Sequence, residues 1–310
     1  MNVGHSPNVV QPPSMTTDDD PLPDLVRALR SKAPVDRVRA AKDLGRLGWL
    51  AREAIPALVA ALKDDDAKVR EAAAQAVGQM GPEALPALAG MLDHTDKYVR
   101  RNAVWAMGKL GPAARVAIRD LCQALKDADP RTASGAAQAL GNMGPAGAEA
   151  VPPLAEAMRG TNIVLCRLAA KALSQIGPPA LSTLIAHLQH SDPFVRGESA
   201  LALGWMGERA RAAVPFLAQV VRGPRGADRR AEKPKSDSVF SGAATPPVVP
   251  TPEASGTAED NCRVYAAQAL GRIGPPAAKA LPDLQEAARN GGSALRTAAE
   301  QAIRMIQGTE

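Results

Sequence analysis

The 310-residue sequence predicts an all-α fold, a right-handed α-solenoid of about eight helix pairs with a period of 30–33 residues. Three observations predict it. The phrase "VRRNAVWAMGKLGP" at Val99 recurs in altered form along the chain, a second phrase such as "IPALVAALK" at Ile55 precedes most copies, and only eight residues are aromatic. A fixed period of this length is typical of solenoids, in which each unit buries its apolar stripe only against its neighbours.

The first phrase predicts the second helix of each unit, which we call helix B. In one copy the apolar residues Val99, Ala103, Met107 and Leu110 recur at helical spacing and form one stripe. A glycine then supplies a left-handed stop. The copies end at Gly48, Gly81, Gly111, Gly144, Gly177, Gly207 and Gly274, and an eighth copy from Leu295 lacks this glycine.

Polar residues lie three positions before the first apolar residue of helix B, and they are Asp66, Asp96, Asp129, Asn162, Asp192 and Glu259. The Asp and Asn side chains among them are expected to cap the helix. The second phrase predicts the first helix of each unit, helix A, and a proline marks its start. These prolines are Pro23, Pro56, Pro86, Pro152, Pro215 and Pro282. Each unit is therefore helix A, a short turn, helix B and a glycine stop.

A further glycine lies inside most copies of helix B, at Gly45, Gly78, Gly108, Gly141, Gly204 and Gly271. Each costs about 1 kcal/mol of helix stability relative to alanine. A cost repeated in so many units predicts that a neighbouring helix approaches the backbone closely at this position.

These units resemble HEAT repeats of the short, phycobilisome-lyase-like type over residues 22–307. In such families the Asp of the turn between helices A and B and the Arg after the first Val often form a ladder between units. The matching arginines here are Arg37, Arg70, Arg100, Arg196, Arg263 and Arg296. Ala133 and Cys166 depart from the pattern, so we expect the ladder to be interrupted in the fourth and fifth units.

Two segments do not follow the repeat pattern. Residues 1–20 are polar, contain prolines and are expected to be a disordered tail. The solenoid is expected over 21–310, interrupted by a disordered loop at 223–258 that is rich in Pro, Ser, Thr, Gly and Ala. The loop could be a neutral insertion or a tether for a partner, and the sequence leaves both interpretations open.

Cysteine usage and hydropathy limit the possible locations. The three cysteines, Cys122, Cys166 and Cys262, are far apart and odd in number, which favours a reducing, cytoplasmic compartment. The N-terminus has no signal-peptide pattern, and no apolar run is long enough to span a membrane. We expect the three thiols to be buried and inert.

Some families that resemble these HEAT-like repeats are enzymes, and each suggests an alternative function for this chain. Deoxyhypusine hydroxylases resemble this chain in period, but they bind a di-iron centre through His-Glu dipeptides. None of the four histidines, His5, His94, His187 and His190, is followed by Glu, so that oxidoreductase activity is disfavoured. The short bilin lyases are also similar, and a chaperone-like lyase remains the alternative function. HEAT-like DNA glycosylases need a catalytic acid, and we can place none here.

No catalytic residue, cofactor or metal site is expected. His187 and His190 lie three residues apart near Asp192, a spacing that could hold a metal. A solvated turn is the preferred interpretation of this pair. Glycine pairs occur at helix ends and not after strands, which argues against a dinucleotide site.

The variable side of helix B is the predicted binding surface. With the first apolar residue of helix B as position 1, positions 3, 4, 7 and 11 lie opposite the core, and the HEAT resemblance implies that they line a concave face. These 32 positions hold eight basic and two acidic residues, and three of the chain's five Trp and Tyr residues. The predicted partner-binding residues are Arg46, Arg101, Trp105, Lys109, Arg167, Lys171, Trp205, Tyr265 and Arg272.

Aromatic and arginine side chains dominate protein interfaces. We therefore predict a non-catalytic scaffold or adaptor that binds an acidic peptide or protein segment on its concave face. An ordinary solvated helix face is the competing interpretation. Nucleic acid is not expected, because the basic residues are diluted by glutamines and spread over eight units.

Overall fold

The computed structural model describes residues 21–223 and 257–309. Over these residues the chain forms α-helices and short 3-10 helices and no β-strand, which confirms the all-α solenoid. The packing divides the chain into two compact units, residues 1–87 and 88–310, and each is described by itself. The predicted tail at 1–20 and positions 224–256 of the predicted loop lie outside the described residues.

The first unit contains two helix pairs. Its elements are α1 (Leu22–Ala28), α2 (Pro34–Leu47), η1 (Gly48–Ala54), α3 (Ile55–Ala61), α4 (Ala67–Met80) and η2 (Pro82–Ala84), and the short helix α5 (Leu85–Ala89) includes residues of both units. Leu44, Leu58 and Met80 are fully buried and form the core of this unit.

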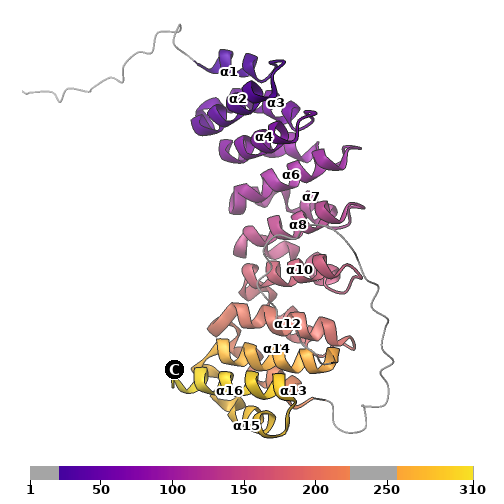
Figure 1. The fold of residues 1–310 in the computed structure, drawn as a ribbon, viewed down its shortest axis with the longest axis vertical. Helices are drawn as coiled ribbons and strands as arrows, with labels where there is room; N and C mark the ends of the chain where they lie inside the picture. The colour runs from indigo at the N-terminus through magenta and orange to yellow at the C-terminus, as the bar shows by residue number, and fades with distance from the viewer. Residues whose placement is uncertain (1–20, 224–256, 310) are drawn as a thin grey trace, which may run out of the picture. The chain divides into compact units, whose positions relative to one another are not determined.

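The second unit contains the remaining helix pairs. Its B helices, which lie toward the viewer in Figure 1, are α6 (Lys97–Leu110), α8 (Pro130–Asn142), α10 (Ile163–Ile176), α12 (Pro193–Met206), α14 (Ala258–Ile273) and α16 (Ser293–Gln307). Its further A helices are α7 (Ile118–Ala124), α9 (Val151–Ala157), α11 (Leu181–His187), α13 (Val214–Arg222) and α15 (Leu281–Asn290). The 3-10 segments η3 (Gly111–Ala117), η4 (Gly144–Ala150), η5 (Pro178–Ala180), η6 (Gly207–Ala213) and η8 (Pro275–Ala280) lead from each B helix to the next A helix.

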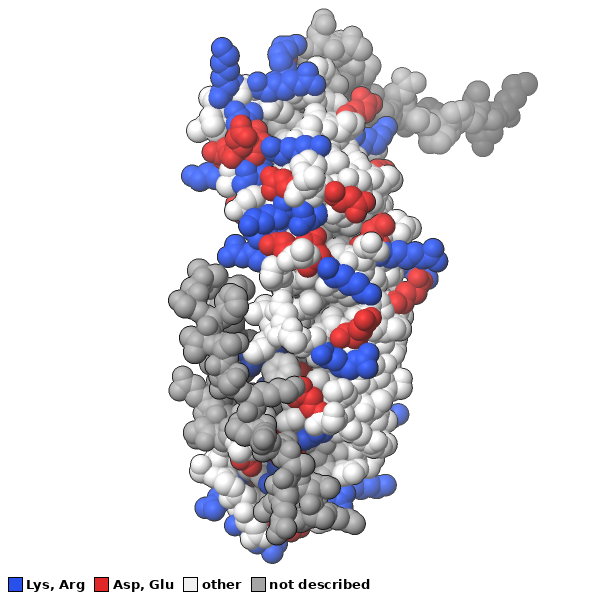
Figure 2. All heavy atoms as spheres, turned by 90° about the vertical axis from the view of Figure 1, so that its right-hand side faces the viewer, with Lys and Arg blue, Asp and Glu red and all other residues white. Residues whose placement is uncertain are grey.

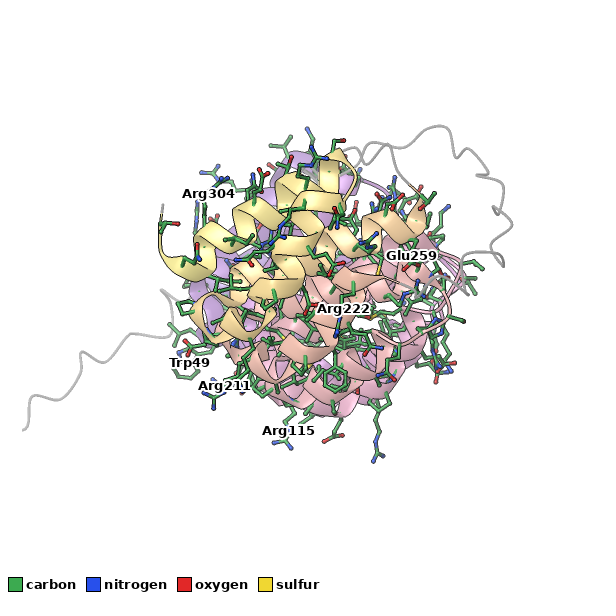
Figure 3. The ribbon with its side chains drawn as sticks, turned by 90° about the horizontal axis from the view of Figure 1, so that it is seen from below. Trp49, Arg115, Arg211, Arg222, Glu259 and Arg304 are labelled. Carbon is green, nitrogen blue, oxygen red and sulfur yellow. The ribbon has the colours of Figure 1, made fainter. Side chains whose placement is uncertain are left out.

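The two kinds of connection lie at different edges of the second unit. Glu259, close to the start of α14, lies on one side in Figure 3, whereas Arg115 of η3 and Arg211 of η6 lie on another. One edge therefore carries the turns between helices A and B, and the other carries the 3-10 segments.

The predicted helix starts are mostly confirmed. The side chains of Asp66, Asp96, Asp129, Asn162 and Asp192 each accept a hydrogen bond from a backbone N–H of the first helical turn. In the seventh unit the capping residue is Thr257, because α14 begins at Ala258. Thr257 and Asp260 form a reciprocal capping box that satisfies two otherwise unpaired N–H groups, so Glu259 lies inside the helix.

The glycines have two distinct roles. Those that end the B helices, among them Gly111 with φ +53° and Gly274 with φ +76°, adopt the left-handed backbone that only glycine adopts without strain. The glycines inside the B helices allow close packing. A Cβ at Gly141 would lie 2.9 Å from the Cα of Ala172 in the next B helix, which is closer than real Cβ atoms come.

Two B helices lack the interior glycine. Ser174 takes its place in α10 and is buried. Arg304 takes its place in α16, and it points outward in Figure 3.

Candidate functional site

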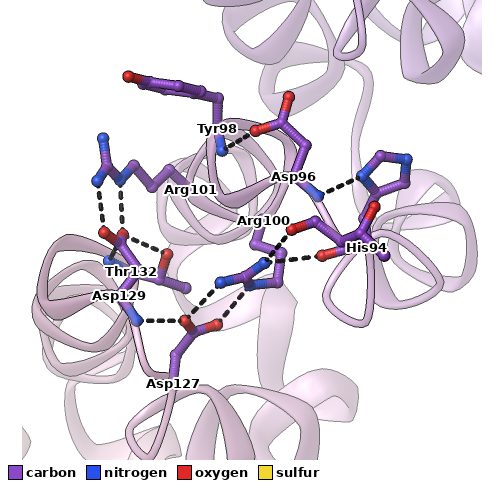
Figure 4. Close-up of polar contacts among 9 residues, drawn as sticks. His94, Asp96, Tyr98, Arg100, Arg101, Asp127, Asp129 and Thr132 are labelled. Carbon is purple, nitrogen blue, oxygen red and sulfur yellow. Dashed lines mark hydrogen bonds and ion pairs between the residues drawn. The ribbon is translucent and has the colours of Figure 1, made fainter.

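The predicted ladder exists where both of its charged partners are present. In the first unit, the Arg37 guanidinium donates two hydrogen bonds of 2.7 Å to the carboxylate of Asp64. In the second unit, Arg100 donates to Asp127 at 2.7 and 2.8 Å, and Arg196 pairs with Glu259. Each arginine also donates Nη1 to two backbone carbonyls of its own turn, as for Arg100 in Figure 4. The arginine thus fixes its own turn to the next one.

The remaining ladder positions bind backbone carbonyl groups in several ways. Arg70 donates to the carbonyls of Asp64 and Asp65, both in its own turn. Arg263 donates Nε to the carbonyl of Val221 at 2.9 Å, and Arg296 contacts the carbonyl of Gly291 at 3.5 Å. Basic and acidic side chains accordingly lie intermingled along the edge with the turns in Figure 2. These contacts give the ladder arginines a structural role.

The predicted interruptions are confirmed, and they are compensated differently. The Cys166 thiol donates to the carbonyls of Gly160 and Ala157 at 3.3 and 3.4 Å, so it replaces the arginine within its own turn. Burial raises the pKa of this thiol to about 11, which keeps it protonated and able to donate. Ala133 faces a turn that carries Gly160 where Asp127 stands in the preceding turn, so both partners are absent together and no charge is left unpaired.

The exposed side of the B helices in the second unit carries eight of the nine predicted partner-binding residues, and we call these eight the B face. They are Arg101, Trp105 and Lys109 on α6, Arg167 and Lys171 on α10, Trp205 on α12, and Tyr265 and Arg272 on α14. The ninth, Arg46, belongs to the first unit, where it is exposed and pairs with Asp43 at 2.7 Å.

The two tryptophans of the B face are accessible to solvent. Trp105 is 39% exposed and Trp205 is 43% exposed. The ammonium group of Lys109 lies 4.7 Å from the centre of the Trp105 ring, which is within the range of a cation–π contact. The helix register predicted from the sequence is therefore correct at both tryptophans. Their role in binding stays a prediction.

Arg101 contacts Asp129 and Tyr98 within the protein. Its Nε and Nη2 donate to the two carboxylate oxygens of Asp129 at 2.6 and 2.5 Å, and its guanidinium lies 5.1 Å from the centre of the Tyr98 ring (Figure 4). The hydrogen bond from Arg101 holds the pKa of Asp129 well below its usual range. Asp129 also accepts from the backbone N–H and the hydroxyl of Thr132, so it caps α8 and pairs with α6 at once.

Arg167 makes a different kind of contact. Its Nε donates to Oε1 of Glu198 on α12 at 3.1 Å, and its side chain is 45% exposed. Glu198 is buried, and its Oε2 has no hydrogen-bond partner in the described chain. Burial raises the pKa of Glu198 against the opposing effect of Arg167. Burial and the Glu198 charge also raise the pKa of Tyr265, a neighbour on α14.

Two basic residues of the B face carry free charge. Lys171 and Arg272 are exposed, and neither forms an ion pair with any residue that the structure describes. The sequence did not indicate that Asp129 and Glu198 would pair with B-face arginines. A signal existed for Glu198, since it is an acid at position 4 of helix B, where the neighbouring copies carry Leu168 and Tyr265.

The described residues contain no group of three or more His, Cys, Asp or Glu side chains that could hold a metal ion. His94 and His190 accept hydrogen bonds at Nδ1 from the backbone N–H of Asp96 and Asp192, which is the role that Asp127 has in its turn. Cys122 lines an open cleft between α7 and α9, where burial raises its pKa to about 11 and so disfavours the nucleophilic thiolate.

Comparison with known protein families identifies the repeats as HEAT repeats. A model described as HEAT repeats matches residues 22–96, 85–165 and 151–232, and one described as PBS lyase HEAT-like repeat matches residues 263–290. No curated protein matches the sequence. No helix of the described chain is both long and apolar enough to cross a bilayer.

Several solved structures are similar in fold. Human deoxyhypusine hydroxylase, in complex with glycerol, is 23% identical with a TM-score of 0.36, over 93% of this chain and 96% of that one. The CpcE–CpcF complex of phycocyanin lyase from Nostoc is 21% identical with a TM-score of 0.39, over 92% and 99%. Escherichia coli YibA is 15% identical with a TM-score of 0.46, over 91% and 92%. These likenesses indicate nothing about partner or activity.

Proposed function

The chain belongs to the HEAT-repeat family, and on that premise we propose that it is a non-catalytic scaffold that binds an extended, acidic protein segment along its B face. The observation that carries the proposal is the exposure of Trp105 and Trp205 on one side of the B helices. Large aromatic side chains left open to water on a helix face are typical of interaction surfaces.

The positions of the two tryptophans suggest how a partner would lie. Trp105 is on α6 and Trp205 is on α12, three B-helix steps apart. With a spacing of about 9 Å between packed helices, the two lie about 27 Å apart, which an extended chain spans in about eight residues. The proposed partner segment therefore carries two apolar side chains separated by about eight residues.

The charges favour an acidic partner. The two acids that contact B-face arginines, Asp129 and Glu198, are buried and paired, whereas Lys109, Lys171 and Arg272 are exposed. The exposed charge of the B face is therefore positive. Such residues act mainly on association rate and orientation, and they weaken as salt screens them.

The test is a comparison of three Trp→Ala variants. Partners captured from the native organism are identified by mass spectrometry with the wild-type protein and with Trp105→Ala and Trp205→Ala. We expect both variants to lose a common partner, with thermal midpoints close to that of the wild-type protein. Trp49→Ala is the matched control, because Trp49 is 64% exposed but lies on η1 in the other unit.

One observation favours a second function, the match of residues 263–290 to the PBS lyase HEAT-like repeat. A bilin lyase or bilin-protein chaperone would purify with visible absorbance after co-expression with a bilin pathway. Colour that is lost in Trp205→Ala would favour this alternative. A colourless protein that still captures its partner would favour the scaffold.

A further inference from the structure

We propose that Arg167, held in place by the buried Glu198, binds a carboxylate of the partner, and that this acidic side chain docks between Arg167 and Lys171 beside Trp205. The inference rests on the proposed function and adds the chemistry of one contact. Glu198 acts as a positioning residue, because it touches Arg167 and not the partner.

The hydrogen bonding of Arg167 leaves its outer edge available. Only Nε is engaged, by Oε1 of Glu198, and neither Nη1 nor Nη2 donates to any protein group that the structure describes. Arg101 contrasts with it, since Nε and Nη2 are both bound by Asp129 and only 19% of the side chain is exposed. A guanidinium fixed through Nε presents its two terminal nitrogens in the fork that matches a carboxylate.

The burial of Glu198 is unfavourable for stability, which suggests that this residue is present in order to position Arg167. Glu198 is 2% exposed, its Oε2 has no partner, and burial raises its pKa. A buried carboxylate with one unsatisfied oxygen destabilises a fold. Unfavourable features such as an unsatisfied buried oxygen are expected mainly at functional sites, where the position of a neighbouring side chain matters more than stability. Here that neighbour is Arg167.

The surroundings of Arg167 complete a subsite. Lys171 follows Arg167 by four residues, so both side chains rise from the same side of α10. Trp205 follows Glu198 by seven residues on α12 and shares its stripe. The Tyr265 ring packs against α12, where a Cβ at Gly197 would lie 3.1 Å from its Cδ2. The proposed subsite therefore combines two cationic side chains of α10 with Trp205 on α12 and Tyr265 on α14.

The probe is a fluorescent peptide with Trp at both ends and about eight Glu and Ser residues between them, matching the estimated span. Binding to the full-length protein is followed by anisotropy at several salt concentrations. We expect saturable binding that weakens with salt, and much weaker binding of the same peptide with Gln in place of Glu. An oligo-dT strand that binds more tightly through the same residues would overturn the acidic-protein assignment.

Arg167→Gln is expected to weaken peptide binding roughly tenfold or more, since it removes a charge-assisted contact. Arg119→Gln is the matched control, because it makes the same change on the A helix α7, outside the B face. Equal effects of the two variants would show that only net charge matters, and the proposal would then be wrong.

Substitution of Glu198 is a further test, because an effect of net charge and an effect on the position of Arg167 predict opposite changes in affinity for the acidic peptide. If only charge mattered, replacing this acid by Met would tighten binding of an acidic peptide. If Glu198 positions Arg167, Glu198→Met weakens binding several-fold, and Glu198→Gln, which still offers an oxygen to Nε, restores much of the loss. Tighter binding in Glu198→Met, with an unchanged thermal midpoint, would overturn the positioning role.

The same peptide separates this inference from the function on which it rests. Loss of binding in Trp205→Ala together with full binding in Arg167→Gln would keep the B face as a docking surface and reject the carboxylate subsite. No binding of the acidic peptide to the wild-type protein would reject the subsite as well. The partner captured through Trp105 and Trp205 would then decide the proposed function separately.

Discussion

Two contacts between successive B helices of the second unit, which we call joints, are built from the same repeat but are stabilised differently. Between α6 and α8, Gly108 allows Ala139 to approach, and two arginines each form a bidentate pair with an aspartate of the next turn. Between α10 and α12, Ser174 replaces the glycine, Cys166 replaces the ladder arginine, and one single-contact ion pair crosses the joint. At the first joint both carboxylates have arginine partners on both oxygens, whereas at the second joint one oxygen of Glu198 has no hydrogen-bond partner in the described chain.

This difference separates the charged residues that stabilise the fold from those available for binding. At the α6–α8 joint every donor on the facing edge of Arg101 is satisfied internally, so little is left for a partner. At the α10–α12 joint Glu198 satisfies one donor of Arg167, and the others face outward. Two arginines at the same repeat position thus have different roles because their acidic partners sit at different places in the next helix.

The largest predicted effect is at the α6–α8 joint. Asp129→Ala removes a helix cap and leaves Arg101 without its partner, so we expect a loss of about 3 kcal/mol in the free energy of unfolding. Glu198→Met, at the other joint, should change it by less than about 1 kcal/mol, because an apolar isostere replaces a poorly satisfied buried charge. Urea denaturation of the two variants measures both values, and equal losses would contradict the contrast.

The two joints should also respond oppositely to pH. The folded-state pKa of Asp129 is lowered by Arg101, so its contribution is complete above the unfolded value of about 3.9 and is lost as the pH falls through the folded value. The folded-state pKa of Glu198 is raised by burial, so its ionisation subtracts stability, which returns as the pH falls through that value toward the unfolded value of about 4.3.

Denaturation curves between pH 3 and 8 test these signs. Asp129→Asn should flatten the acid limb of the stability profile, and Glu198→Gln should raise stability near neutral pH relative to the wild-type protein. A Glu198→Gln variant that loses stability at neutral pH would show that the ionised pair is a net stabilising contact.

A smaller effect is expected from the interior glycines. Gly141→Ala gains helix propensity but places a Cβ 2.9 Å from the Ala172 Cα, so we expect a net loss of about 1–2 kcal/mol. Ser174→Ala should be nearly neutral, within about 0.5 kcal/mol, because the α10–α12 joint already accommodates a Cβ at this position. Thermal melts of the two variants compare the joints directly, and a stabilised Gly141→Ala would disprove the close-packing role.

The smallest predicted effect is a repair of the ladder. Introducing Ala133→Arg together with Gly160→Asp recreates the pair that Arg100 and Asp127 form in the preceding unit. A double-mutant cycle should give a favourable coupling of about 1 kcal/mol, while each single change is neutral or destabilising. Zero coupling would show that the ladder pairs are incidental to stability.

Features that depend on residues close together in the chain could be predicted from the sequence. The repeat period, the helix pairs, the caps at Asp96 and Asp129 and the glycine stops could all be predicted, because a cap or a stop involves groups within about four residues of one another. The cap at Thr257 was missed because this residue lies outside the repeat register, although it forms a local capping box with Asp260.

Which charged side chains remain free for a partner depends on the packing of the helices. Arg101 lies 28 residues from Asp129 and Arg167 lies 31 residues from Glu198, and both pairs form across helices. Whether such side chains meet depends on the spacing and rotation of successive helices, which no local pattern encodes. The division of the chain into two compact units is likewise a property of packing. The exposure of Trp105 and Trp205 could therefore be predicted from the sequence, but the difference between Arg101 and Arg167 could not.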